Sequence, residues 1–565
     1  MELLEQHFDT AFSAPDGIQK LRKLILTLAM QGKLVPQDPS DPPASNLLKE
    51  IGAEKKRLVK EGKIKAPKLL PPVTEKEKPY ALPQRWQWVR LIEIGYWALG
   101  SGLPHSIQGE TDQKILLCKV SDMNLPGNEK FIVSSNNSVS EETAKASKLS
   151  VSEPGTIIFP KIGGAIATNK RRILLKRTVI DNNCLGITPY SLVDLEWAYQ
   201  LLLSFDFSKY QTGTSVPAIS QGTIGEIVVG LPSAPEQHRI VAKIDQLMAR
   251  CDALEKLRAT QKAKRLAVHA AALSQLLDAT DNGSTNDAWV FITQHFGELY
   301  AVKENVVELR KAILQLAMMG KLVPQDPNDP PASELLKEIE AEKKRLVKEG
   351  KIKAPKPLKP VTEEETPYAL PHGWEWVRVR DVAQLITSGS RDWATYISDS
   401  GAIFVTMGNL SRGSYQLRMD NVRYVNPPAS GEGSRTKLEE NDLLISITGD
   451  VGNLGLIPPN FGDAYINQHT CLLRFMPSCR TRYFPELMRS PLAKLQFDEP
   501  QRGIKNSFRL SDVGEMLIPL PPLTEQHRIV EKIDQLMVLC GTLDQQITAA
   551  TCKQSELLNA VMADV

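Results

Sequence analysis

The feature that most constrains the fold of this chain is an internal repeat. The sequence EKKRLVKEGKIKAPK at 54–68 recurs without a change at 342–356, a shift of 288 positions. The same shift relates three shorter blocks: GKLVPQDP at 32 and 320, PYALP at 79 and 367, and WxWVR at 86 and 374. A further block, EQHRIV followed by KIDQLM, begins at 236 and returns at 525. Such a repeat predicts one structural frame that is built twice.

The order of these blocks predicts a circular organisation. The middle of the chain holds EQHRIV and then GKLVPQDP, whereas the two ends hold GKLVPQDP first and EQHRIV last. The two ends taken together therefore match the middle. We expect the amino-terminal arm to pack beside the carboxy-terminal arm, as the two central blocks do, which gives a pseudo-two-fold arrangement.

Two unlike segments fill the gaps in the frame, and each opens with WxWVR and closes in an apolar run that ends in Pro. We predict an α+β fold with two mixed α/β globular variable domains joined by long helices. The predicted parts are an amino-terminal helical arm and linker at 1–85, the first variable domain at 86–235, a central helical region and linker at 236–373, the second variable domain at 374–524, and a carboxy-terminal helix at 525–565.

The EQHRIV blocks open helices with coiled-coil spacing, because apolar residues alternate gaps of four and three. One series is Ile240, Ile244, Leu247, Cys251 and Leu254; the other is Ile529, Ile533, Leu536, Cys540, Leu543 and Ile547, extended by Leu557 and Val561. A seam of this length needs a partner, so we predict long antiparallel coiled-coil helices. Cys251 and Cys540 are expected to be small core residues.

The GKLVPQDP blocks follow the candidate partner helices, whose apolar stripes lie at 21–28 and 309–316. Gly32 and Gly320 are expected to end these helices. After a Pro-rich turn, charged helices are predicted at 47–60 and 335–348, with an exposed lysine-rich face. Each is followed by a stiff, extended linker.

The bulk composition bounds the class of protein. Hydrophobic residues make up 42% of the chain and charged residues 24%, as in globular proteins. No run approaches the roughly 18 apolar residues of a membrane-spanning helix, the amino terminus shows no leader, and the seven cysteines form no paired motif. We expect a cytoplasmic protein with free thiols and no membrane partner. Because 68 Lys and Arg residues face 66 Asp and Glu residues, any DNA-binding surface must be a local patch.

Motifs for catalysis are absent from the sequence. There is no GxxxxGK[ST] phosphate loop, GxGxxG turn, HExxH pair or cysteine metal site. Asn426-Pro427-Pro428 is similar to the Asn/Asp-Pro-Pro-aromatic motif of amino-methyltransferases, but Ala429 stands where the ring that stacks on a flipped base is needed. At the starts of the seam helices, His238 and His527 are expected to pack or to form a terminal hydrogen bond. We predict a non-catalytic chain that holds no cofactor and no metal.

The paired EQHRIV helices, the WxWVR openings and the circular order resemble the specificity subunits of type I restriction-modification systems, over essentially the whole chain. The resemblance implies a protein that binds a split target in double-stranded DNA. Each variable domain reads one half-site and the helical frame sets the spacer. It also implies two modification subunits that carry the methyltransferase activity and S-adenosylmethionine, and restriction subunits that use ATP and Mg to translocate and cleave DNA.

The resemblance assigns no base-reading residues, so candidates come from residue type and from loops, where recognition groups usually lie. Segment 86–232 balances 13 basic and 13 acidic residues, but a basic cluster surrounds Gly163-Gly164. Segment 374–522 has 13 Arg and only 3 Lys, which suits bidentate contacts to guanine and phosphate. The predicted DNA-binding residues are Lys161, Asn169, Lys170, Arg171, Arg172, Gln211, Thr212, Thr214, Ser215, Ser390, Arg391, Asn409, Arg412, Gln468, His469, Arg502, Lys505 and Asn506.

Two other classes of protein remain open at this point. A self-contained DNA methyltransferase or restriction-methylation fusion requires a cofactor loop and an intact aromatic motif. A coiled-coil adaptor that never touches nucleic acid does not require two large, dissimilar inserts at matching places of a duplicated frame.

Overall fold

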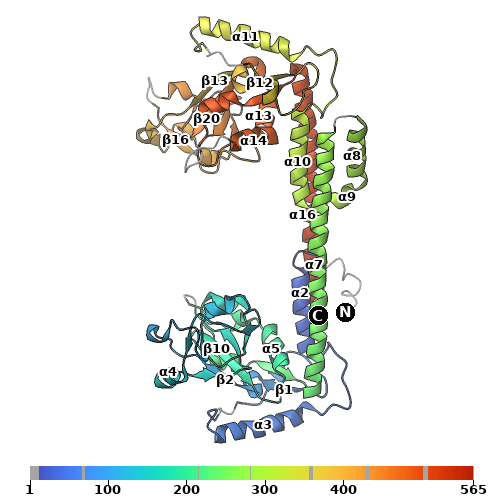
Figure 1. Cartoon of the computed structure of the whole chain (residues 1–565), viewed down its shortest axis with the longest axis vertical. Helices are drawn as coiled ribbons and strands as arrows, with labels where there is room; N and C mark the ends of the chain where they lie inside the picture. The colour runs from blue at the N-terminus through green and yellow to red at the C-terminus, as the bar shows by residue number, and fades with distance from the viewer. Residues whose placement is uncertain are drawn as a thin grey trace. The chain divides into compact units, whose positions relative to one another are not determined.

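The computed structural model describes residues 12–66, 70–213, 216–279, 282–354, 360–427, 433–499 and 507–563. The chain divides into two compact units, Met1–Thr260 with Thr551–Val565, called unit 1, and Gln261–Ala550, called unit 2. Two long helices, α7 (Ala234–Asp278) and α16 (Leu523–Ala563), begin in one unit and end in the other (Figure 1). Each unit contains one variable segment and one copy of the repeated frame.

In unit 1, helix α2 (Gly17–Met30) packs along the first part of α7. Ile25 of α2 shares a buried cluster with Ile244 and Cys251 of α7. Arg22 adds ion pairs to Asp252 at 2.7 Å and to Glu255 at 3.0 Å. In the seam predicted for α7, Ile240, Ile244 and Cys251 are therefore buried, Leu247 is partly buried against the same cluster, and Leu254 is 40% exposed.

The end of α16 also packs on α2 in unit 1. Leu558 and Val561 are buried with Leu24 in one cluster, and Lys20 Nζ donates to Asn559 Oδ1 at 2.6 Å. The amino-terminal and carboxy-terminal arms thus pack together, as the order of the blocks predicts.

In unit 2, helix α10 (Lys303–Met318) takes the place that α2 has in unit 1. Its Ile313 is buried with Ile533 and Cys540 of α16, and Arg310 forms an ion pair with Asp544 at 2.9 Å. The prediction that Cys251 and Cys540 are core residues is confirmed, since each is 1% exposed. Between α7 and α10 lie α8 (Asn282–Gln294) and α9 (Phe296–Leu299).

Glycines end α2 and α10, as predicted: Gly32 has φ +71° and Gly320 has φ +68°. A Cβ atom on Gly320 would lie 2.4 Å from Cγ of Pro371, so the linker also requires glycine there. The charged helices are α3 (Ala44–Lys60) and α11 (Ala332–Lys348). Both begin three residues earlier than predicted, directly after a proline, because the fixed φ of proline is compatible with a helix start.

The first variable domain contains a main sheet of strand order β2-β10-β7-β8-β4, a second sheet β5-β3-β9-β6 and the pair β1-β11. Its strands are β1 (Gln87–Arg90), β2 (Gly95–Leu99), β3 (Ile115–Cys118), β4 (Phe131–Ile132), β5 (Ser138–Val139), β6 (Val151–Ser152), β7 (Ile157–Pro160), β8 (Arg172–Leu174), β9 (Thr178–Ile180), β10 (Cys184–Pro189) and β11 (Val228–Leu231), and its helices are α4 (Glu141–Ala146), α5 (Leu195–Ser204) and α6 (Gln221–Gly225).

The second variable domain repeats this plan with the main sheet β13-β20-β17-β18, a second sheet β14-β16-β15-β19 and the pair β12-β21. Its strands are β12 (Glu375–Arg378), β13 (Ala383–Ser388), β14 (Ile397–Ser398), β15 (Ala402–Val405), β16 (Arg423–Val425), β17 (Leu443–Ser446), β18 (Leu454–Leu456), β19 (Ala464–Ile466), β20 (Thr470–Phe475) and β21 (Leu517–Leu520), and its helices are α12 (Val379–Val382), α13 (Tyr483–Arg489), α14 (Pro491–Asp498) and α15 (Leu510–Glu515).

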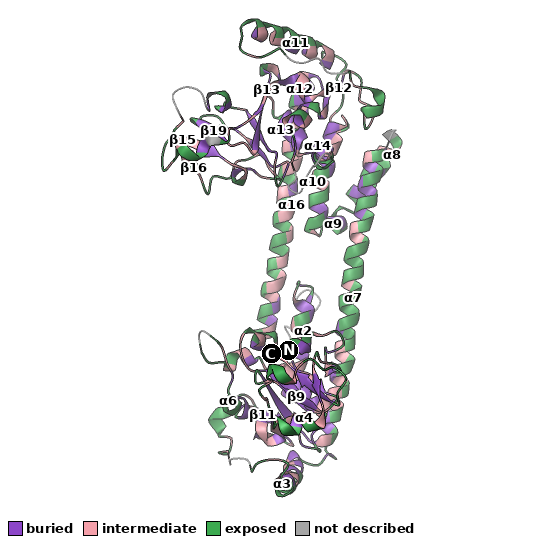
Figure 2. Ribbon diagram, turned by 60° about the vertical axis from the view of Figure 1, so that its left-hand side comes forward, coloured by how far each residue is buried: buried purple, intermediate pink, exposed green. Residues whose placement is uncertain are grey.

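The inner strands of the main sheets, β7 in the first domain and β17 and β20 in the second, are buried along their whole length, as the buried strands of Figure 2 illustrate. In each domain the first strand pairs antiparallel with the last, β1 with β11 and β12 with β21. The WxWVR signature and the Pro-ending apolar run are therefore the two strands of one pair. This pairing brings the two ends of each insert to the same place on the frame.

Candidate nucleic-acid interface

Each variable domain gathers several loops at one end of its main sheet. In the first domain, β2 and β7 end where β10 begins, because Leu99 pairs with Leu185 and Pro160 pairs with Cys184. In the second domain, β13, β17 and β20 meet in the same way. We call these loops the loop edge, which comprises 100–104, 161–171, 181–183, 211–213 and 216–219 in the first domain and 389–392, 447–453, 467–469 and 507 in the second.

The two loop edges are built with the same backbone contacts. Ser101 bridges Asp181 in one and Ser390 bridges Asn467 in the other, both in parallel sense. The preceding glycine is required in both domains. A Cβ atom on Gly100 would lie 2.0 Å from the carbonyl oxygen of Asp181, and one on Gly389 would lie 2.0 Å from that of Ile466.

In the first domain, the structure brings the loop that contains Lys161 and the loop that contains Thr212 together. Lys161 accepts a backbone hydrogen bond from Ile219 at 2.9 Å, and both Ile162 and Thr212 bridge Ala218. Gln211 and Thr212 are exposed, and Lys161 is half-buried. Lys170 donates to the side chain of Asn124. Two distant segments that the sequence nominated separately thus form one surface.

Arg171 does not belong to that surface, which corrects the interpretation of the Lys170-Arg171-Arg172 run as one patch. Its side chain is 1% exposed, donates to the carbonyl oxygens of Leu202 and Lys170, and lies 3.9 Å from the ring centroid of Phe207. Burial lowers the pKa of Arg171 to about 9. The guanidinium closes the core in this structure and is not available to a phosphate.

The neighbours of Arg171 are held partly by the same structure. Asn169 adopts a left-handed backbone with φ +50°, and its side chain donates to Leu203 O and accepts from Arg171. Arg172 is half-buried and donates to Met123 O at 3.1 Å, and burial lowers its pKa. Lys161 and Lys170 are therefore the basic predicted residues that remain for a contact with DNA in this domain.

In the second domain, three predicted residues meet at the turn before β20. Gln468 Nε2 lies 2.9 Å from His469 Nε2, and His469 Nδ1 lies 2.8 Å from the hydroxyl of Thr448. Ser390 forms a β-bridge with Asn467, the residue before Gln468 in the same turn. Arg391 follows and is exposed.

Arg412 and Asn409 come from the loop after β15. Arg412 donates to Asp450 Oδ1 at 2.7 Å, and both side chains are more than half exposed. Asn409 is only 6% exposed, because its side chain accepts from Thr406 N and donates to Arg418 O. Asn409 therefore holds the loop rather than facing solvent. Five predicted residues lie outside the described part of the chain: Thr214, Ser215, Arg502, Lys505 and Asn506.

Sequence reasoning missed several residues that the loop edges contain. Ser101, Asn182 and Asn183 lie on the first edge, and Thr448 lies on the second. One signal was present, since both domains place Gly-Ser directly after the strand that precedes the edge, at 100–101 and 389–390.

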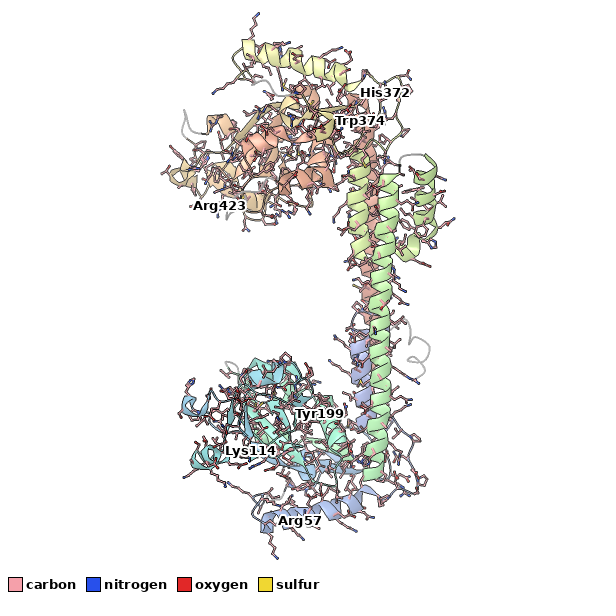
Figure 3. The ribbon with its side chains drawn as sticks, viewed as in Figure 1. Arg57, Lys114, Tyr199, His372, Trp374 and Arg423 are labelled. Carbon is pink, nitrogen blue, oxygen red and sulfur yellow. The ribbon has the colours of Figure 1, made fainter. Side chains whose placement is uncertain are left out.

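The frame places buried carboxylates at the starts of the seam helices. Glu525 is 1% exposed, and it accepts from Trp374 Nε1 at 2.9 Å and from Gln325 at 2.6 Å (Trp374 is labelled in Figure 3). Burial raises its pKa. Glu236 stands at the matching place, accepts from Gln37 and has its pKa raised by burial. These contacts hold the linker on the helix start.

Of the two expectations for His238, packing or a hydrogen bond at the helix start, the structure fits the second. Its side chain is 69% exposed, with Nε2 lying 3.2 Å from Asp194 Oδ2. Asn426 opens the segment that is similar to the methyltransferase motif. It is exposed, and its side-chain amide donates to Ser398 Oγ at 3.1 Å. Pro428 and Ala429 lie outside the described residues.

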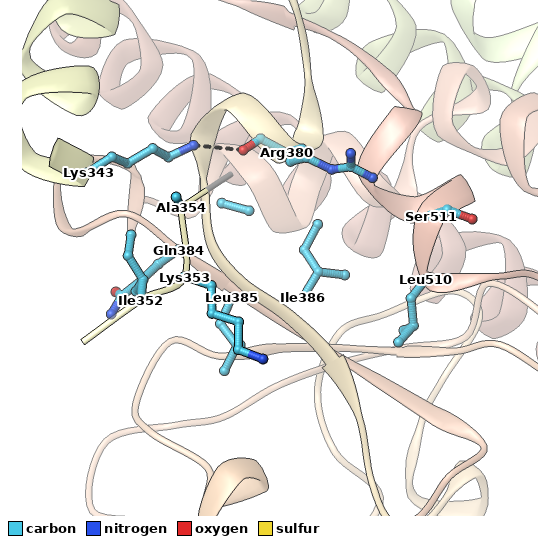
Figure 4. A pocket seen from close by; sticks show the side chains of 11 residues that line it. Lys343, Ile352, Lys353, Ala354, Arg380, Gln384, Leu385, Ile386, Leu510 and Ser511 are labelled. Carbon is cyan, nitrogen blue, oxygen red and sulfur yellow. Dashed lines mark hydrogen bonds between the residues drawn. The ribbon is translucent and has the colours of Figure 1, made fainter. Parts of the chain in front are cut away.

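A pocket of unit 2 shows how the repeated linker meets its domain. It is lined by α11, by the IKA sequence that follows α11, and by β13 and α15 (Figure 4). Lys343 Nζ donates to the carbonyl oxygens of Arg380 at 2.8 Å and Asp381 at 2.7 Å, and burial lowers its pKa. A matching pocket in unit 1 is lined by Ile64, Lys65 and Ala66 together with β2 and α6. The identical IKA segments thus line a pocket on the variable domain in both units.

Two further findings concern the described residues. No group of three or more His, Cys, Asp and Glu side chains among them is arranged to hold a metal ion. None of their helices is long and apolar enough to cross a membrane.

Comparison with known proteins identifies the family. The model of the type I restriction modification DNA specificity domain matches residues 105–265 and 371–550. The EcoAI specificity subunit of Escherichia coli is 33% identical over 565 residues, covering 96% of this chain and 93% of that protein. The EcoEI specificity subunit of Escherichia coli is 30% identical over 581 residues with the same coverage.

Among solved structures, the HsdS subunit from Thermoanaerobacter tengcongensis matches with 18% identity and a TM-score of 0.41, covering 86% of this chain and 98% of that one. The domain match, which falls on both copies of the repeat, and the two full-length relatives agree. The chain therefore belongs to the specificity subunits of type I restriction-modification enzymes, the non-catalytic component that confers DNA-target specificity.

Proposed function

We propose that this chain reads a bipartite target in double-stranded DNA, with each loop edge contacting one half-site. The observation that carries the proposal is that two domains of unlike sequence build the same loop edge on a duplicated frame. Polar and basic side chains gather there, the exposed Thr212 and the half-buried Lys161 on one edge and the exposed Arg391 and the half-buried Gln468 on the other. The domain boundaries proposed from the sequence, 86–235 and 374–524, bracket these edges.

We infer that the helical frame sets the spacer between the half-sites. Helix α7 has 45 residues and is continuous from unit 1 into unit 2, which corresponds to a length of about 68 Å. Helix α16 likewise belongs to both units. The proposal is that α7 and α16 form an antiparallel coiled coil with pseudo-two-fold organisation and act as a ruler.

The partners of the chain follow from the same proposal. Each copy of the frame docks one modification subunit, so that two are held, and restriction subunits join them. S-adenosylmethionine, ATP and Mg act in those partners. We place the complex in the cytoplasm, where free thiols persist, in keeping with the free cysteines of this chain.

The test uses the full chain together with its modification partner. Selection from random-sequence duplex DNA should recover one motif with two specified parts and an unspecified spacer of constant length. Recovery of a single continuous motif would contradict the bipartite reading. A lack of any motif would favour an adaptor role, and methyl transfer by the purified chain alone would favour a self-contained methyltransferase.

A further inference from the structure

The turn before β10 and the turn before β20 have the same geometry. Asp181 Oδ1 accepts from the backbone N–H of Asn183, and Asn467 Oδ1 accepts from that of His469, both at 3.1 Å. The carbonyl oxygens of Asn183 and His469 in turn accept from the residue that follows β7 or β17, at 2.8 and 3.0 Å. Both turns are therefore held from two sides, and each has a single residue at its tip.

The tip residue carries a carboxamide in both domains, Asn182 in the first and Gln468 in the second. Apart from the Gly-Ser that opens each of them, the two loop edges otherwise differ in sequence. The glycine that opens the first loop edge allows the turn to come this close, because a Cβ atom on Gly100 would also lie 2.9 Å from Cα of Asn182. The two domains thus present the same functional group from the same place.

The surroundings of Gln468 use one of its two N–H groups and leave the rest of its hydrogen-bonding capacity for a ligand. Its Nε2 donates to His469 Nε2 at 2.9 Å, and His469 Nδ1 then donates to the hydroxyl of Thr448 at 2.8 Å. The Thr448 hydroxyl donates onward to Met407 Sδ at 3.7 Å. This relay orients the amide and leaves Oε1 and one N–H of Gln468 without a partner among the described residues.

Asn182 is exposed, and its side chain has no hydrogen-bond partner among the residues that the structure describes. Its neighbour Asn183 differs, because its amide donates to Asp181 Oδ2 at 3.1 Å. The turn therefore uses two of its three polar side chains internally and leaves the tip for contact with another molecule.

We propose that Asn182 and Gln468 are matched base-reading residues, each recognising one adenine in its half-site. This inference rests on the proposed function. A carboxamide offers one acceptor and one donor side by side, which match the N6 amino group and N7 of adenine in the major groove. Guanine presents two acceptors at the same edge, so a carboxamide cannot satisfy both. His469 and Thr448 are positioning residues that orient the Gln468 amide.

The test is motif selection from random-sequence duplex DNA with the full chain and its modification partner. Gln468→Ala should remove the preference for adenine at one position of one half-site, a loss of about 10- to 100-fold in discrimination. Gln468→Glu keeps the shape of the side chain, but a carboxylate only accepts hydrogen bonds. The base preference at that position should therefore move to cytosine, whose N4 amino group donates. Asn182→Ala and Asn182→Asp should produce the same changes in the other half-site only.

Two controls separate base reading from folding. Gln113→Ala alters an exposed carboxamide at the far end of β3 from the loop edge and should leave the motif unchanged. His469→Ala should weaken the adenine preference without replacing it, because the amide remains but is no longer oriented. Variants that bind with unchanged motifs at every position would overturn the inference while leaving the proposed function intact. A wild-type chain that selects no motif would refute the proposed function itself.

Discussion

The buried ion pair between Arg474 and Asp442 allows a quantitative test of what holds the second variable domain together. Asp442 is 1% exposed and accepts from Arg474 Nε and Nη2, both at 2.7 Å. Among the described residues, the other donor to its carboxylate is the backbone N–H of Glu439 at 2.6 Å. Arg474→Met therefore leaves a buried carboxylate with a single donor, and we expect it to lower the free energy of unfolding by about 3–5 kcal/mol.

The pH dependence of that loss has a defined sign. Burial is the largest influence on the pKa of Asp442 and raises it above its usual value of 3.8, while Arg474 opposes the rise. Without Arg474 the pKa rises further. A carboxyl group with a raised pKa in the folded state contributes stability at low pH that is lost as the pH rises through that pKa. The loss in Arg474→Met should therefore be largest near neutral pH and should shrink as the pH falls toward 3.8.

The measurement is urea unfolding of the full chain at several pH values, followed by hydrogen exchange of the amides of β20, since these report on the second domain alone. The double variant Asp442→Asn with Arg474→Met removes both charges and should recover most of the loss. A loss that is the same at every pH, or a double variant no more stable than the single one, would refute this account of the pair.

Four further predictions concern DNA binding and the structure that supports it. Replacing Lys161 and Lys170 with Ala should reduce the slope of log affinity against log salt by about two, since each phosphate contact contributes about 0.9; an unchanged slope in a titration would remove both from the interface. Arg171→Met should leave that slope unchanged and instead lower the free energy of unfolding by about 2–3 kcal/mol, measured by urea titration. Gly389→Ala should abolish selection of one half-site only, because its Cβ atom would lie 2.0 Å from Ile466 O; loss of both half-sites would contradict local placement. Inserting seven helical residues into both α7 and α16 should lengthen the selected spacer by about 10 Å, close to three base pairs at about 3.4 Å each, and an unchanged spacer would refute the ruler.

The sequence by itself determined the frame, because the frame depends on local and periodic features. The repeat located the two copies, and the spacing of Ile240, Ile244 and Cys251 predicted the buried face of α7 before any partner was known. Glycine at 32 and 320 marked the helix ends through backbone conformation alone. The circular order of the blocks anticipated that the end of α16 packs on α2.

Tertiary structure alone decided which candidate residues share the loop edges. Lys161 and Thr212 become neighbours because strand pairing joins segments about fifty positions apart, and a sequence pattern does not specify that pairing. Arg171 reads as an ordinary surface cation until the packing of Phe207 over its guanidinium is known. Asn182 gained its place at a turn tip only through contacts of its neighbours. Periodic burial is encoded along the chain, whereas the neighbours of a loop side chain are set by long-range pairing.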